Sequence, residues 1–168
     1  MRTQAILSDE HLHAIGLVTA EWAELEYYLH ATIWALAGMQ NPGRGNAITD
    51  HLRAQQLSQA LESVALDRFE QSPEYDEIQS LCKEIRHQYE ERNKFAHAKW
   101  QIDHIDNQVY RLNRRKRKRL SAGWEPYAVS DILTVAKEIS HLTDRLDELF
   151  FRYKPDTWPD EPRRPNLQ

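Results

Sequence analysis

Three side chains suited to acid–base and phosphate chemistry lie within six positions of the sequence, in the segment ERNKFAHAKW at residues 91–100. They are Arg92, Asn93 and His97. An arginine can bind a phosphate through two parallel hydrogen bonds and stabilise the charge that develops there. A histidine titrates near neutral pH, so it can take a proton from a ribose 2′-hydroxyl or give one to the leaving oxygen. These residues would suffice for metal-independent RNA cleavage that leaves a 2′,3′-cyclic phosphate.

The same residues also have structural interpretations. On a helix with 100° per residue, Arg92 lies about 40° from the centre of the apolar stripe, where a leucine is expected. A buried guanidinium keeps its charge and needs an acid or an anionic ligand. Glu26 would supply the acid if it formed an internal ion pair with Arg92. His97 would then be a polar residue near a helix C-terminus, where a positive charge is favoured.

Hydrophobic periodicity predicts the elements that position these residues. Apolar residues recur every three or four positions over residues 8–36, 47–69 and 73–98, and again after residue 130, which predicts four long amphipathic helices. Ser8 and the Ser72–Pro73 pair are helix-start signals, and Gly38 is a helix-end signal. We expect NPGRGN at 41–46 to be a connecting loop. Four helices without alternating strands predict an all-α, up-and-down bundle.

The helical period breaks between the third and the last helix. Residues 100–102 and 109–112 flank the sequence DHIDN and predict a short β-hairpin that packs on the helices. We therefore predict a single helical domain over residues 8–154, with the hairpin and a basic segment at 100–120 inserted before the last helix. The proline-rich tail at 155–168 is expected to be disordered.

A family resemblance agrees with this interpretation. The segment RNKFAH at 92–97 resembles the R-x(4–6)-H signature of HEPN domains, including the polar residue that many members carry after the arginine. The segment GLVTAEWAELEYYLHATIWALAG at 16–38 resembles the first helices of HEPN-like bacterial proteins. The resemblance extends over residues 8–150 and is sharp at 92–97.

The resemblance implies a metal-independent endoribonuclease without a cofactor, often a toxin or a phage-defence effector with an antitoxin or regulatory partner. Arg92 and His97 would be catalytic and Asn93 supporting, and we add Tyr89 and Glu26 as residues behind them. It also implies a homodimer in which two Arg/His motifs face one cleft. Some members have no catalytic role, so the alternative is a non-catalytic helical module that binds RNA or a protein partner.

The angle between the two motif residues around the helix axis also favours a dimer. On an ideal helix Arg92 and His97 point about 140° apart. One helix would therefore not direct both side chains at the same phosphate, whereas the motif of a second protomer would complete the site.

Charge is spread unevenly along the chain. The formal net charge is −4, but residues 114–119 (RRKRKR) carry six positive charges. The rest of the chain has 16 basic and 26 acidic residues, so it would repel a polyanion. The basic run would bind the RNA backbone, with Tyr110 and Trp124 as stacking surfaces; an equally weighted interpretation is a solvated charge run. The residues expected to bind RNA are Arg111, Arg114, Arg115, Lys116, Arg117, Lys118 and Arg119.

Composition argues against several other classes of protein. Cys82 is the single cysteine, which excludes an internal disulfide and a Cys-rich zinc site. No carboxylate–histidine cluster has metal-ligand spacing, so we predict no metal. No apolar run approaches the ~20 residues that span a membrane, and the first residues lack the apolar core of a signal peptide. We therefore expect a cytoplasmic protein that does not enter a membrane.

Overall fold

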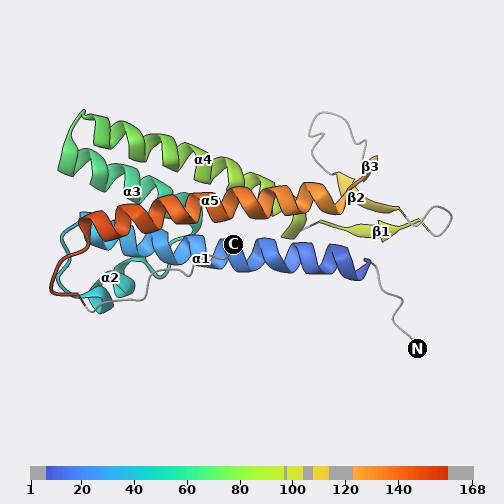
Figure 1. The fold of residues 1–168 in the computed structure, drawn as a ribbon, viewed down its shortest axis with the longest axis horizontal. Helices are drawn as coiled ribbons and strands as arrows, with labels where there is room; N and C mark the ends of the chain where they lie inside the picture. Colours follow the sequence, from blue (N-terminus) through green and yellow to red (C-terminus); the bar gives the residue numbers. More distant parts are fainter. Residues whose placement is uncertain (1–6, 97, 104–107, 114–122, 159–168) are drawn as a thin grey trace.

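The computed structural model describes residues 7–96, 98–103, 108–113 and 123–158 of the 168-residue chain. This part is mostly helical, with a small antiparallel sheet before the last helix (Figure 1). The predicted helical fold with strands before the last helix is confirmed. The elements are α1 (Asp9–Leu36), α2 (Pro42–Thr49), α3 (Ala54–Phe69), α4 (Pro73–Ala96), β1 (Trp100–Ile102), β2 (Val109–Asn113), β3 (Gly123–Pro126) and α5 (Val129–Tyr153).

The two longest helices form the centre of the bundle. α1 and α5 lie side by side and run in the same direction (Figure 1). The Thr32 hydroxyl in α1 donates a hydrogen bond to the carbonyl of Leu146 in α5 at 3.4 Å. Fully buried apolar side chains from both helices fill the space between them, because each helix has an apolar stripe along its whole length. They include Ala14, Leu25 and Leu29 of α1, and Ile132, Ile139, Leu146 and Leu149 of α5.

The direction of the helices differs from the up-and-down order that we predicted. Arg68, near the end of α3, donates to the carbonyls of Ala35 and Leu36 at the end of α1, so α3 runs parallel to α1. Of the four long helices, α1, α3 and α5 run one way and α4 runs the other way, as Figure 1 shows. Its antiparallel contacts include an ion pair from Arg145 of α5 to Glu84 at 2.7 Å. Because α3 has 16 residues and α1 has 28, α3 covers only the half of the bundle that is distant from the sheet (Figure 1).

The second predicted helix, residues 47–69, is two helices. α2 begins inside the segment that we expected to be a loop, with Asn41 as its N-cap and Pro42 in its first turn. The Asn41 side chain accepts a hydrogen bond from the Gly43 backbone N–H at 2.8 Å. These are ordinary helix-start signals, which the two glycines of NPGRGN obscured. The chain then leaves helical geometry after Thr49 and restarts at Ala54.

The signals for the start and the end of helices that we identified in the sequence are confirmed. Ser8 caps α1, and the Ser72 hydroxyl accepts from the Tyr75 backbone N–H at 3.3 Å at the start of α4. Gly38 has a φ of 64° directly after the end of α1, a conformation that costs glycine little. The third predicted helix ends at Ala96, two residues earlier than expected.

The sheet packs on the end of the bundle where α4 finishes and α5 begins (Figure 1). The predicted hairpin is present, with Trp100 opposite Arg111 and Ile102 opposite Val109. A third strand, β3, pairs with β2 and was not predicted. All four residues of β3 are exposed, and its sequence GWEP contains a glycine and a proline, which are turn signals rather than strand signals.

The first residues after α5 pack on the core. Trp158 is only 6% exposed, and its indole N–H donates to the Met39 carbonyl at 2.9 Å. Its ring lies 6.0 Å from that of Phe150. We expected disorder over residues 155–168, but Trp158 packs on the core. The rest of that tail, residues 159–168, lies outside the described residues. No described helix combines the length and the apolar character that crossing a lipid bilayer requires.

Candidate functional site

The buried stripe of α4 changes from apolar to polar near the sheet. Ile78, Leu81 and Ile85 are fully buried, and the next positions of the stripe are Gln88 and Arg92, which are half-buried. The Gln88 Oε1 and Arg92 Nε atoms are buried and have no hydrogen-bond partner among the described residues. Because a buried polar atom without a partner costs free energy, these two residues mark a place where α4 is not optimised for packing alone.

Arg92 lies against an aromatic ring of α1. Its guanidinium carbon is 5.9 Å from the centre of the Trp22 ring, within the range of a cation–π interaction. Trp22 is buried and in turn contacts the ring of Tyr89 at 5.8 Å. Arg92 Nη1 donates a hydrogen bond to the Oδ1 atom of Asn93 at 3.1 Å. The aromatic ring and the amide therefore hold the guanidinium, and both are neutral.

No described carboxylate forms an ion pair with Arg92. Glu26, the acid that we considered in the structural interpretation, instead lies near His30 on its own helix. Burial lowers the pKa of that imidazole, and the charge of Glu26 partly opposes this. Glu91, the acidic neighbour on α4, pairs with Lys94. A guanidinium has five N–H donors and cannot lose its charge. Within the described residues, Arg92 therefore keeps donors available for an anion.

The other residues of the predicted motif are placed only in part. Arg92 and Asn93 lie together on the last turns of α4. The ring of Tyr89 contacts the ring of Trp22, which in turn contacts Arg92. His97 directly follows α4 but lies outside the described residues, and so does the basic run from Arg114 to Arg119. Their proposed roles stay predictions.

Arg111, which we grouped with the RNA-binding residues, is in the interior. It is 8% exposed and faces the bundle from β2. Its guanidinium carbon lies 4.8 Å from the centre of the Tyr127 ring, and its Nη atoms approach the Lys94 carbonyl and a Glu125 carboxylate oxygen, both at 3.5 Å. Burial raises the pKa of the Tyr127 hydroxyl, and Arg111 opposes that rise. Arg111 thus joins the sheet to the end of α4, which leaves little of its side chain for RNA.

Sequence analysis did not identify Trp22 as the aromatic ring beside Arg92. It also missed a polar cluster that fastens α2 to α1. The Thr49 hydroxyl interacts with His30 Nδ1 at 2.7 Å and accepts from Trp34 Nε1 at 3.0 Å. Gly45 packs so closely on the Trp34 ring that an added Cβ would lie 2.5 Å from it. Burial lowers the pKa of His30, while the carboxylates of Glu26 and Asp50 oppose this. No spacing in the sequence indicates that these residues meet.

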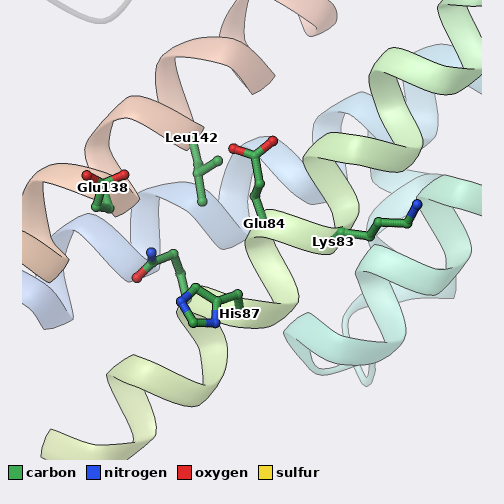
Figure 2. A pocket seen from close by; sticks show the side chains of 6 residues that line it. Lys83, Glu84, His87, Glu138 and Leu142 are labelled. Atoms are coloured by element: carbon green, nitrogen blue, oxygen red, sulfur yellow. The ribbon is translucent and has the colours of Figure 1, made fainter.

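A groove of about 490 Å³ lies between α4 and α5 (Figure 2). Glu84 already pairs with Arg145, and Lys83 points away from the other labelled side chains in Figure 2. In the described part of the chain, no three His, Cys, Asp or Glu side chains are placed to hold a metal ion. The lining residues are Lys83, Glu84, His87, Gln88, Glu138 and Leu142.

Comparison of the chain with models of known protein families, with curated protein sequences and with solved structures yields no match. The resemblance to HEPN domains therefore stays a prediction from residues 92–97 and 16–38. The function must be argued from Arg92 and the residues around it.

Proposed function

We propose that the protein is a metal-independent endoribonuclease. Arg92 binds the scissile phosphate and stabilises the charge that develops on it, and His97 transfers protons. The 2′-hydroxyl oxygen attacks the phosphorus atom and loses its proton to a base. The bond to the 5′-oxygen breaks, and this oxygen receives a proton from an acid. The products are a 2′,3′-cyclic phosphate and a free 5′-hydroxyl.

The observation that supports this proposal best is the environment of Arg92. The guanidinium is half-buried, it rests on Trp22, and its Nε atom has no hydrogen-bond partner in the part of the chain that the structure describes. Asn93 holds one Nη atom without neutralising the charge. A structural arginine in a protein interior is normally paired with an acid, whereas an arginine that binds a phosphate must keep its donors for the ligand.

The proposal includes a homodimer. Arg92 and His97 would point about 140° apart on an ideal helix, so the Arg92 of one protomer would act with the His97 of the other in a shared cleft. A role as a toxin or defence effector with an antitoxin partner belongs to the same proposal. Expression of the wild-type chain would then stop cell growth, and expression of Arg92→Ala would not.

The test is cleavage of a mixed RNA by the purified chain in excess EDTA. The wild type is expected to leave 2′,3′-cyclic phosphate ends. His97→Ala is expected to cut no RNA, and His87→Ala, which changes an exposed histidine on α4, is expected to cut like the wild type. Cleavage that EDTA abolishes, or that survives in His97→Ala, would contradict the mechanism. A folded wild type that binds RNA but leaves it intact would favour the non-catalytic binding module.

A further inference from the structure

One face of the sheet points away from the helices. Successive side chains of a strand point to opposite faces. Val109 and Arg111 are buried toward the bundle, so Tyr110 and Leu112 of β2 point outward. Residues directly opposite each other in an antiparallel sheet share a face. Leu112 pairs with Trp124, so Trp124 also lies on this outer face.

Trp124 differs from the other tryptophans of the chain. Trp22, Trp34 and Trp158 are buried, and Trp100 packs on the Tyr127 ring. Trp124 is 41% exposed. Within the part of the chain that the structure describes, its indole makes no hydrogen bond and no ring contact. An exposed indole on a sheet offers a large flat surface on which a ligand ring can stack.

The charge around this face suits a polyanion. Lys99 directly precedes β1 and is exposed. Its carbonyl accepts a hydrogen bond from the Leu112 N–H, so it lies next to Leu112. The segment that joins β2 to β3 contains the six consecutive cations of residues 114–119. The described residues on either side of this segment, Asn113 and Gly123, pair with each other. The rest of the chain is acidic, so among the described residues the exposed Lys99 supplies the positive charge that a polyanion would meet at this end of the sheet.

We infer that the outer face of the sheet binds single-stranded RNA, with a base stacked on Trp124 and the backbone close to Lys99. Stacking on an aromatic side chain needs an exposed base face, which a single strand offers and a duplex hides. The choice of RNA rests on the proposed function, and it deepens that function by naming the form of the substrate. The sheet lies at the same end of the bundle as the last turns of α4, which carry Arg92 (Figure 1).

The test uses the full chain and a fluorescently labelled 12-nucleotide RNA whose 2′-hydroxyls are methylated, so that it cannot be cut. Trp124→Ala is expected to weaken binding about fivefold to about a hundredfold, the usual effect of losing one stacked base. Trp124→Phe keeps an aromatic ring and is expected to retain most of the affinity. Tyr27→Ala, which removes an aromatic side chain that is 46% exposed on α1, serves as the matched control and is expected to bind like the wild type. The thermal midpoint of each variant shows whether it is folded.

Equal affinity of folded Trp124→Ala and wild type would overturn the inference. Equal binding of a 12-base-pair duplex of the same sequence would also overturn it, because charge alone would then explain the binding. The same variants distinguish failure of this inference from failure of the proposed cleavage activity. A chain that binds this RNA through Trp124 but does not cut unmodified RNA retains the inference and loses the enzymatic function.

Discussion

Arg92 and Arg111 lie near the same end of the bundle, and both place a guanidinium beside an aromatic ring. In both, the Nε atom is buried and has no hydrogen-bond partner within residues 7–96, 98–103, 108–113 and 123–158. Their other donors differ. Arg111 reaches the Glu125 carboxylate and the Lys94 carbonyl, whereas Arg92 has only the neutral Asn93 amide among the described residues.

This difference separates a structural arginine from a candidate binding residue. The charge of Arg111 is balanced inside the fold, and its contacts connect β2, β3 and α4. The charge of Arg92 is not balanced, so an anion that enters the site would gain an electrostatic interaction that no described side chain already uses. We therefore expect substitutions of Arg92 to affect activity and substitutions of Arg111 to affect stability.

The largest effect is expected for Arg92→Ala. Removal of a donor that stabilises charge in a transition state typically lowers the rate about 100-fold or more. The free energy of unfolding should fall less than in Arg111→Ala, because no ion pair is lost and only the Trp22 ring contact and the hydrogen bond to Asn93 are removed. Initial rates of RNA cleavage and thermal unfolding curves measure both quantities. Retention of the wild-type rate would mean that the free donors of Arg92 have no part in the reaction.

Arg111→Ala is expected to lower the free energy of unfolding by about 1–3 kcal/mol, since it removes several buried contacts at once. Cleavage should persist at temperatures where the variant is folded. Arg111→Met keeps most of the side-chain volume and serves as the control for packing. If neither variant changes the midpoint of urea unfolding, Arg111 does not hold the sheet to α4.

Asn93→Asp would make Arg92 resemble Arg111. It places a carboxylate where the amide oxygen now accepts from Arg92 Nη1 at 3.1 Å, so an ion pair would occupy the guanidinium. We expect cleavage to fall about tenfold or more, without loss of stability. Asn93→Ala removes the amide without adding charge, and it is expected to retain more activity than Asn93→Asp. The opposite order would show that orientation by Asn93 matters more than an unpaired Arg92.

A smaller effect is expected from pH, through a histidine at the other end of the bundle. Burial lowers the pKa of His30 from its ordinary value of 6.5. The neutral form is therefore favoured in the folded state, and its contribution to stability is complete above pH 6.5 and is lost as the pH falls through the lowered pKa. Urea unfolding between pH 7.5 and 5 should show this loss. The pH dependence should be weaker in His30→Gln than in His13→Gln, which changes an exposed histidine, and equal slopes would contradict the assignment.

Much of the helical fold could be predicted because it depends on local patterns. The apolar stripes of α1, α4 and α5 and the Ser8 and Ser72 caps were visible in the sequence, and so was the polar interruption at Arg92. The direction of α3 was not predictable in this way. It depends on the path of residues 37–53, and periodicity gives the faces of a helix but not the neighbour that each face meets.

The candidate site was predictable to the same extent. The sequence correctly predicted that Arg92 and Asn93 lie close together, because both are on one helix. The pairing of Arg92 with Glu26 required knowledge of how α1 rotates against α4, and in the structure Trp22 faces Arg92 instead. The burial of Arg111 depends on which face of β2 meets the bundle, which a five-residue strand without clear alternation does not indicate.

The most direct test of phosphate binding by Arg92 is a nitrogen–hydrogen NMR spectrum of the arginine Nε–H groups, recorded during addition of a 2′-O-methylated dinucleotide phosphodiester. Arg92→Lys and Arg111→Lys assign the two signals. We expect the Arg92 signal to shift in a saturable way and the Arg111 signal to stay in place. An Arg92 signal that does not move while the dinucleotide binds elsewhere would contradict the assignment of Arg92 as the phosphate-binding residue.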